Sequence, residues 1–190
     1  MLNIVLFGKP GSGKGTQAEF IKKKYNLVHI STGEVFRSNI ISDTRLGKIA
    51  KSYIERGDLV PDSLTIEMLK TEVEKYKSRN GFIFDGFPRT KDQAIALDKF
   101  LKTKEMRISA TISLEADDKE LIKRLLLRGK KSGRIDDQDE KKIENRFEEY
   151  NKKTSILREY YNVHNKFYTI NGVGSVVEIT NRLSSLIDDL

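Results

Sequence analysis

The chain has 190 residues, of which 37% are hydrophobic and 33% are charged, with no cysteine and a net charge of +7. This size fits one globular domain, and the absence of cysteine excludes disulfides and thiolate metal sites. The net positive charge is compatible with binding to nucleic acid, to an anionic membrane or to a phosphorylated small molecule, and it does not distinguish among these partners. The apolar runs are far shorter than the roughly 20 residues of a membrane span, and the first residues lack the basic region of a signal peptide. We therefore expect a cytoplasmic protein without a membrane partner.

Strand-like runs alternate with helical patterns along the chain. The strand-like runs are residues 2–7, 26–30, 81–85, 108–114 and 166–170. The residues that recur at helical spacing are Ala18, Ile21 and Tyr25, then Ile66, Leu69, Val73 and Tyr76, then a long stripe of Ile143, Phe147, Tyr150, Thr154, Leu157 and Tyr161, and finally Val176, Ile179, Leu183, Leu186 and Leu190. Ser175 and Glu178 have the spacing of a capping box for the last helix. The alternation predicts an α/β fold, in which parallel strands carry helices on both faces of the sheet.

Two polar segments depart from this alternation. Residues 31–60 contain no strand-like run, and we predict that they form short polar helices closed by GDLVPD. Residues 129–139, GKKSGRIDDQD, are almost all polar or glycine. We interpret both segments as insertions above the sheet.

The first strand-like run leads directly into GKPGSGKGT. Gly8, Gly13 and Lys14 match the Walker A pattern, which follows a strand and opens a helix. Closely spaced backbone amides and the positive end of that helix form a nest for a polyphosphate, and Lys14 reaches the outer phosphates. Gly15 occupies the usual Ser/Thr position and Thr16 follows it, which weakens the case for a magnesium ion held directly by a hydroxyl.

A second motif, FIFDGFPRT, places Asp85 at the carboxyl end of an apolar strand, where open α/β sheets bind ligands. A carboxylate there can hold the water shell of a magnesium ion that bridges phosphates. Arg89 follows in a loop with Gly86 and Pro88, and its planar fork of donors suits a phosphate. The alternative interpretation is a helix cap by Asp85 beside a surface Arg89.

A third motif, STGEVFR, follows the second strand-like run. Ser31 and Glu34 have capping-box spacing, which predicts that a helix begins here. Thr32 and Arg37 then lie near a helix N-terminus, just past the carboxyl end of a strand. That position is compatible with a binding site.

Four arginines in the second half of the chain are further candidates. Arg124 and Arg128 share one face of a helix that begins near Asp118. Arg134 lies in the polar segment 129–139, and Arg146 flanks the apolar stripe of the long helix. Each alone could be a surface arginine whose alkyl stem covers the core. A nucleic-acid groove could also use them, but no aromatic residues are interleaved with them, as a stacking platform requires.

Together these motifs resemble the adenylate kinase family of nucleoside monophosphate kinases, and the resemblance covers nearly the whole chain. It rests on GKPGSGKGT (8–16), STGEVFR (31–37), GDLVPD (57–62), GFIFDGFPRTKDQA (81–94), KRLLLRG (123–129) and GRIDDQDEKKIENRFEEY (133–150). The family implies a P-loop NTPase-like core around a five-stranded parallel sheet, formed here by residues 1–30, 61–127 and 139–190. It also implies a monophosphate-binding insertion at 31–60 and a short lid at 128–138.

The resemblance assigns roles by position. It implies ATP contacts from Gly11, Ser12, Gly13, Lys14, Gly15, Thr16, Arg124, Arg128 and Gly174. It implies AMP contacts from Thr32, Arg37, Asp58, Leu59, Val60, Gly86, Phe87, Pro88, Arg89, Gln93, Arg134 and Arg146. The implied catalytic set is Lys14, Asp85, Arg89, Arg128, Arg134 and Arg146. Asp85 would orient hydrated Mg²⁺, and no side chain would bind the metal directly.

The implied reaction is reversible, Mg²⁺-dependent transfer of a phosphoryl group from ATP to AMP, giving two ADP, in purine nucleotide salvage and energy metabolism. The short lid has no cysteine, so no structural zinc is expected, and Gly129 and Gly133 would give the lid its freedom. Lys9 stands where the family usually has proline. It adds a positive charge near the expected phosphates, and the family pattern therefore does not predict the detailed conformation of this loop. The family also implies a monomer.

Three other functions stay open. A UMP/CMP kinase would share the chemistry, but in those sister kinases the residue corresponding to Thr32 is typically alanine and the one corresponding to Gln93 typically asparagine. This chain looks like the adenine-specific type. A P-loop switch that controls a partner protein would not need a second phosphate-binding motif. A nucleic-acid binder is suggested only by the charge, and it would bind in a strongly salt-dependent way. We therefore expect ATP, AMP and ADP as partners and no nucleic acid.

Overall fold

The computed structural model describes residues 1–76 and 80–190. Its sheet has the order β2-β3-β1-β4-β5, and all the pairings are parallel. The strands are β1 (Leu2–Phe7), β2 (Val28–Ser31), β3 (Gly81–Asp85), β4 (Ala110–Glu115) and β5 (Phe167–Asn171). The predicted five-stranded parallel sheet is therefore confirmed. Strand β2 begins later than predicted because Asn26 adopts the left-handed conformation that ends the preceding helix.

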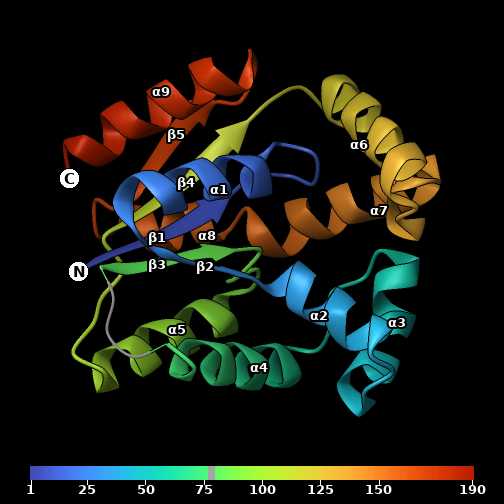
Figure 1. The fold of residues 1–190 in the computed structure, drawn as a ribbon, viewed down its shortest axis with the longest axis horizontal. Helices are drawn as coiled ribbons and strands as arrows, with labels where there is room; N and C mark the ends of the chain where they lie inside the picture. Colours follow the sequence, from blue (N-terminus) through green and yellow to red (C-terminus); the bar gives the residue numbers. More distant parts are fainter. Residues whose placement is uncertain (77–79) are drawn as a thin grey trace.

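Two layers of helices cover the sheet (Figure 1). Side chains alternate along β1: Ile4 faces a core shared with α1 and α9, whereas Val5 faces a core shared with α4, α5 and α8. These helices are α1 (Lys14–Tyr25), α4 (Asp62–Glu74), α5 (Lys91–Thr103), α8 (Leu157–Asn162) and α9 (Val176–Asp188). Burial on both faces explains why β1 reads as a continuous apolar run.

The remaining helices lie beyond the carboxyl ends of the strands, at the right of Figure 1. They are α2 (Thr32–Ile41), α3 (Arg45–Arg56), α6 (Asp118–Ser132), the short 3₁₀ helix Ile135–Asp137 and α7 (Glu140–Glu149). Segment 31–60 forms short helices, as predicted. Segment 129–139 is only partly irregular, because α6 continues to Ser132 before Gly133 ends it in the left-handed conformation.

The predicted helix caps had different outcomes. The capping box of Ser175 and Glu178 is confirmed, since Glu178 N–H donates to Ser175 Oγ and Ser175 N–H donates to Glu178 Oε2. The helix start predicted from Ser31 and Glu34 is confirmed, since α2 begins at Thr32, but the capping box itself was wrong. Ser31 precedes α2 but makes no side-chain cap bond, because it is still the last residue of β2, in register with Asp85 of β3.

Two predicted stripes end earlier than their apolar residues suggested. Tyr76 lies beyond the end of α4, and Leu190 lies beyond the end of α9, and both are exposed. In α9, Val176 is also exposed and Ile187 takes the buried position near the helix end. The apolar spacing therefore located these helices but not their ends.

The predicted long helix is divided. Between α7 and α8 the chain forms a π-helical segment, Tyr150–Thr154. This segment brings Thr154 to the loop after β3, where its hydroxyl donates to the Arg89 carbonyl at 2.9 Å. A π-helical segment within a helical run is often associated with a functional site.

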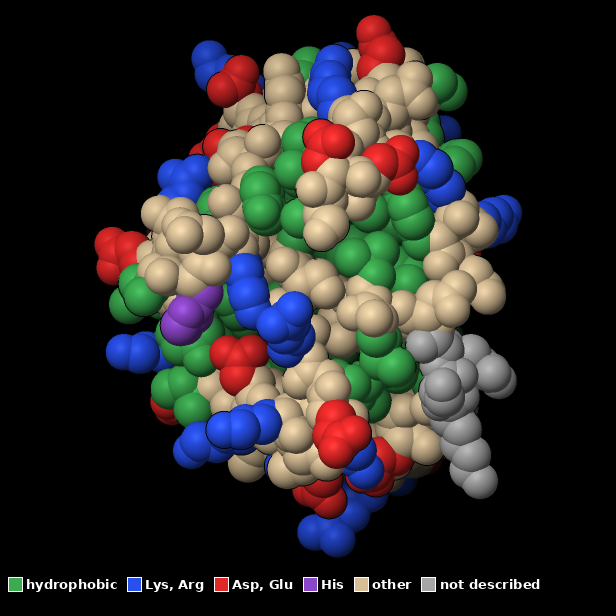
Figure 2. All heavy atoms as spheres, turned by 90° about the vertical axis from the view of Figure 1, so that its left-hand side faces the viewer, with side chains coloured by type: hydrophobic (Ala, Val, Ile, Leu, Met, Phe, Trp, Pro, Cys, Tyr) green, Lys and Arg blue, Asp and Glu red, His purple; other side chains and the backbone are tan. Residues whose placement is uncertain are grey.

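The face of the molecule at the left of Figure 1 shows basic and acidic side chains interspersed rather than gathered in one patch (Figure 2). Such a face is typical of a solvated surface. In the part of the chain that the structure describes, no helix has the length and apolarity needed to cross a bilayer.

Candidate active site

A cavity of about 640 Å³ lies at the carboxyl ends of the strands, between the first motif and the two polar segments. Of the predicted site residues, those that line it are Gly11, Gly13, Lys14, Gly15, Thr16, Thr32, Arg37, Asp58, Leu59, Val60, Asp85, Gly86, Pro88, Arg89, Gln93, Arg124, Arg128, Arg134, Arg146 and Gly174. Ser12 and Phe87 do not line it; both are buried, and Phe87 packs in the core under α4 and α5. One cavity therefore brings together motifs that are far apart in the sequence.

The glycine-rich loop curls around the Lys14 side chain. Gly11 has a φ of +85°, and a Cβ there would lie 2.9 Å from the Leu121 carbonyl oxygen, so the turn and the close approach both require glycine. Lys14 Nζ donates to the carbonyl oxygens of Gly8 at 2.7 Å and Lys9 at 3.1 Å. These bonds hold the ammonium group at the mouth of the amide nest.

The charged form of the Lys14 side chain is destabilised in this position. Burial lowers the pKa of Lys14 to about 8, and the nearby charges of Arg89, Arg146 and Arg128 act in the same direction, against the opposing effect of Asp85. A cation with too few anionic neighbours is a favourable partner for an added anion.

Lys9 extends away from the mouth of this loop. Its Nζ lies 2.7 Å from Asp118 Oδ1 at the start of α6, and 5.2 Å from the centre of the Phe147 ring. The additional charge is thus paired with a carboxylate.

Asp85 is buried at the end of β3. Burial alone would raise its pKa, but the neighbouring His29 and the positive charges of Lys14 and Arg89 more than offset this, so the pKa of Asp85 is lowered. The alternative interpretation of Asp85 as a helix cap was wrong, because Thr90 caps α5 by accepting from the Gln93 N–H. Arg89 lines the cavity instead of the outer surface.

His29, which no motif in the sequence singled out, lies on β2 beside Asp85. Its Nε2 is 3.5 Å from Asp85 Oδ2, and its Nδ1 is 3.0 Å from Glu19 Oε1. A single histidine in a strand-like run carries no signal of this kind, because only the register of β2 with β3 brings the two side chains together.

The residues present fit a magnesium ion that arrives with a nucleotide. The described residues contain no group of three or more His, Cys, Asp or Glu side chains that could hold a metal. They do place one ionised carboxylate, Asp85, beside the glycine-rich loop; a Cβ on Gly15 would lie 3.6 Å from its Oδ2. Magnesium is commonly held by one or two carboxylates together with phosphates and water.

Three cations that line the cavity, Lys14, Arg37 and Arg89, form no ion pair with any carboxylate in the part of the chain that the structure describes. Arg89 Nε donates to the Gly86 carbonyl at 2.8 Å, which fixes the guanidinium and leaves its other donors available. Burial lowers the pKa of Arg37 to about 10. Half-buried cations that form no ion pair indicate an anionic ligand.

Three other arginines surround a buried pair of acids. Asp137 Oδ2 lies 2.6 Å from Arg128 Nε and 3.4 Å from Arg134 Nε, and its Oδ1 lies 2.6 Å from an Arg146 terminal nitrogen. Asp136 pairs with Arg134 and Arg146 as well. These arginines are therefore not surface residues over a core, and the two aspartates hold their side chains toward one another.

The fourth arginine, Arg124, also lines the cavity and is held by two hydrogen bonds. Its Nε donates to Glu120 at 2.8 Å, and a terminal nitrogen donates to the Gly172 carbonyl at 3.1 Å. Arg124 thereby connects α6 to the loop that contains Gly174, which also lines the cavity.

We expected Gly129 to make the backbone of the lid flexible, but the structure gives it a packing role instead. It is buried within α6, and a Cβ there would lie 2.6 Å from the Asp137 carbonyl oxygen. The glycine allows the backbone of the acidic pair to approach the helix. Gly133 has a φ of +69° and open space around it, so it serves as the helix end.

We expect Gly129→Ala to lower the melting temperature, although alanine favours a helix over glycine by roughly 1 kcal/mol. The new methyl group overpacks the contact with Asp137, at a cost of about 1–3 kcal/mol. Thermal unfolding followed by circular dichroism measures the change. Lys130→Ala, at an exposed position of the same helix, is the control and should leave the melting temperature almost unchanged. A stabilised Gly129→Ala variant would show that the contact is not tight.

The end of the cavity formed by α2 and α3 has polar and apolar sides. Thr32 Oγ1 donates to the Gly86 carbonyl at 2.9 Å. Phe36 and Ile54 line the apolar side, and the sequence analysis did not single them out, because apolar residues in short helices read as core. The insertion is held against α7 at this end, since Asn145 Nδ2 donates to the Arg56 carbonyl at 2.8 Å.

Comparisons with known proteins agree with this geometry. The family model for adenylate kinase matches residues 6–166. The chain is 60% identical to an adenylate kinase of Flavobacterium psychrophilum and 48% identical to one of Parabacteroides distasonis, in each case over 190 residues that cover the whole of both chains. It is 45% identical to an adenylate kinase of Leptospira biflexa over 183 residues, which cover 96% of this chain and 98% of the relative. The chain belongs to the adenylate kinase family.

Proposed function

We propose that the cavity holds ATP and AMP together and passes the terminal phosphoryl group of ATP directly to AMP, which is the reaction that family membership assigns to this chain. The observation that carries the proposal is the set of cations that line one cavity and form no ion pair within the described residues: Lys14 at the start of α1, Arg37 in α2, and Arg89 in the loop after β3. A nucleotide switch would need cations for one ligand only. We also propose that the protein acts as a monomer in the cytoplasm.

The main barrier to this reaction is electrostatic repulsion between the two nucleotides, because a nucleophile is already present. The phosphate of AMP is already anionic, so no general base is required. The barrier lies in bringing two polyanions together and in neutralising the charge on the migrating group. We assign Lys14 to the outer phosphates of ATP and Arg89 with Arg37 to the phosphate of AMP. Arg134 and Arg146 then lie between the two phosphate groups.

Magnesium, when bound with ATP, would neutralise charge on the phosphate oxygens. In this chain Asp85 is the residue that would hold its water shell. The amides of the glycine-rich loop would bind the β- and γ-phosphates, with Arg128 and Arg124 along the ATP side. Asp136 and Asp137 would keep the arginines in position while leaving some of the five N–H donors of each guanidinium for phosphate oxygens.

The recognition of AMP would come from the 31–60 insertion and from the loop after β3. Thr32, the backbone of Asp58–Val60 and Gln93 surround the end of the cavity that would hold the base. Thr32 and Gln93 favour adenine over the pyrimidines of a UMP/CMP kinase. No aromatic platform interleaves with the arginines, which argues against nucleic acid.

Water must be excluded, because it would otherwise accept the phosphoryl group. We propose that the lid at 128–138 closes on ATP and that the 31–60 insertion closes on AMP. The hydrogen bond from Asn145 to the Arg56 carbonyl, between α7 and the insertion, supports this proposal.

A bridged dinucleotide, with two adenosines joined by five phosphates, tests the proposal. Calorimetry should give one molecule bound per chain and displacement by both ATP and AMP, and solution scattering should show compaction on binding. Two molecules bound per chain, or competition with ATP alone, would indicate separate sites and contradict direct transfer.

The lowered pKa of Lys14 predicts proton uptake when ATP binds. In the free protein Lys14 is half deprotonated near pH 8, and the incoming phosphates favour the charged ammonium and raise its pKa. At pH 8.5 we expect each ATP to bind with uptake of a fraction of a proton, measured by calorimetry in two buffers of different ionisation enthalpy. Lys14→Arg, which stays protonated, should abolish the uptake. Equal uptake in both proteins would assign it to another group.

A further inference from the structure

The side-chain amide of Gln93 is held between a donor and an acceptor. Gln93 lies in the first turn of α5 and is 2% exposed. Its Oε1 accepts from the Arg89 backbone N–H at 2.7 Å, and its Nε2 donates to Asp62 Oδ1 at 2.7 Å. A backbone N–H only donates and a carboxylate only accepts, so the orientation of the amide is set by its partners.

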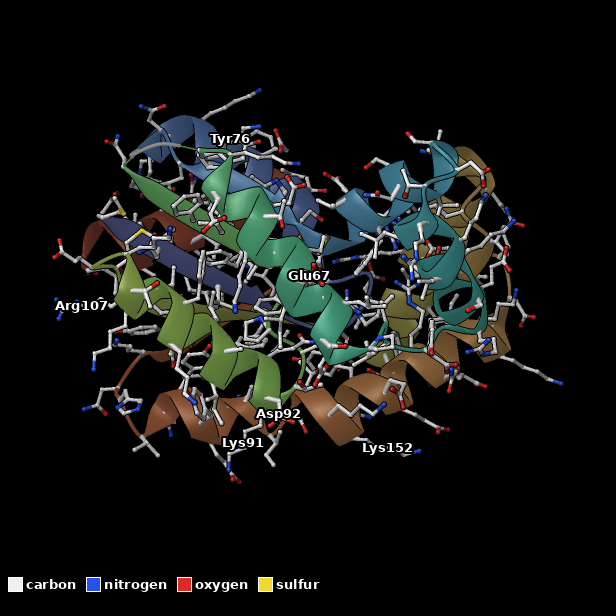
Figure 3. All side chains as sticks on the ribbon, turned by 90° about the horizontal axis from the view of Figure 1, so that it is seen from below. Glu67, Tyr76, Lys91, Asp92, Arg107 and Lys152 are labelled. Atoms are coloured by element: carbon white, nitrogen blue, oxygen red, sulfur yellow. The ribbon has the colours of Figure 1, made fainter. Side chains whose placement is uncertain are left out.

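Asp62 reaches the cavity only through this amide. It is the first residue of α4, and its second oxygen accepts from the Thr90 hydroxyl at 2.6 Å. Gln93 lines the cavity, whereas Asp62 does not. Figure 3 shows α4 and α5 running side by side, with Asp92 at the start of α5 on the outer side. The Asp62 carboxylate thus connects the first turn of α4 to the first turn of α5, because it accepts hydrogen bonds from both Thr90 and Gln93.

The amide keeps one donor and one acceptor for a ligand. A glutamine amide has two N–H groups and two lone pairs, and one of each is used by Asp62 and Arg89. The remaining N–H and lone pair complement the N1 acceptor and the exocyclic amino donor of adenine. Hypoxanthine carries the reverse pattern, with an N1–H donor and an O6 acceptor. An amide turned to fit hypoxanthine would place Oε1 against the carboxylate of Asp62 and its NH₂ group against the Arg89 N–H.

We propose that Asp62 is a positioning residue that fixes the amide of Gln93 and thereby makes the site select adenine over 6-oxopurines. This inference rests on the proposed function, in which Gln93 contacts the base of AMP. Asp62 prevents the Gln93 amide from turning to the opposite orientation, and it does not itself contact the substrate.

The test is Asp62→Asn, assayed with AMP and with inosine monophosphate at fixed MgATP. Asparagine has nearly the same shape as aspartate but can present either a donor or an acceptor to Gln93, which removes one of the two barriers to the turned amide. We expect the ratio of kcat/KM for AMP to that for inosine monophosphate to fall about tenfold, mainly through KM. Asp92→Asn is the matched control, because it removes the same charge from an exposed position in the first turn of α5; its ratio should equal that of the wild type.

An unchanged ratio in folded Asp62→Asn would overturn the inference. Calorimetric binding of the two monophosphates to Asp62→Ser gives the same comparison without turnover, in case the first variant does not fold; a fall in the affinity ratio supports the inference and an unchanged ratio overturns it. A wild-type protein that uses neither monophosphate would overturn the proposed function instead, so the two failures are distinguishable.

Discussion

Replacing Lys14 with methionine should lower kcat about 10³-fold, the scale expected when one preorganised charge is removed from developing negative charge. The Lys14 ammonium is fixed by the carbonyl oxygens of Gly8 and Lys9 at the mouth of the amide nest. Methionine keeps the length of the side chain and removes the charge. Steady-state ADP formation measures the effect.

Stability should not fall with activity in Lys14→Met. Burial lowers the pKa of Lys14 from 10.5 in its ordinary state to about 8. The folded protein therefore binds fewer protons than the unfolded chain between these values, so wild-type stability rises with pH across this range. At pH 7 the charged lysine is a cost, and Lys14→Met should melt at the same temperature or higher. A near-normal rate, or a large loss of stability, would remove Lys14 from the assigned role.

Replacing Arg89 with lysine should lower kcat/KM for AMP at least about 10²-fold, even though the charge is retained. Arg89 is anchored through Nε to the Gly86 carbonyl, and its free donors form a planar fork in the cavity. A lysine ammonium cannot make both the anchor and a paired contact with phosphate. The KM for ATP should change little, because the loss is confined to the acceptor side.

Arg107→Lys is the control for this substitution, since Arg107 is exposed and lies far from α2, α3 and α7 in Figure 3. Its kinetic constants should equal those of the wild type. If Arg89→Lys weakened ATP and AMP equally, Arg89 would not be specific to the acceptor.

Local patterns were sufficient to predict the architecture. Alternation of apolar runs and helical stripes predicted the parallel sheet, and Gly8, Gly13 and Lys14 predicted the turn from β1 into α1. The helix start at Ser31 was predicted correctly, but its capping bond was not, because pairing with β3 keeps Ser31 in the strand.

The parts of the site that were missed depend on tertiary contacts. His29 and Asp85 meet only through the register of two strands that are far apart in sequence. Asp62 meets Gln93 only because two helices pack side by side. Asp136 and Asp137 could be recognised in the sequence as charged residues. Their burial among three arginines depends on how α6 packs against α7.

The most direct test of the central claim is a coupled assay of ADP formation from MgATP, with AMP, UMP, CMP and GMP offered in turn and one reaction without any acceptor. We predict rapid turnover with AMP alone, two ADP formed for each ATP consumed, and negligible hydrolysis without an acceptor. Turnover chiefly with UMP or CMP would contradict the assignment of adenine recognition to Thr32 and Gln93. ATP binding without transfer to any acceptor would contradict direct phosphoryl transfer in this cavity.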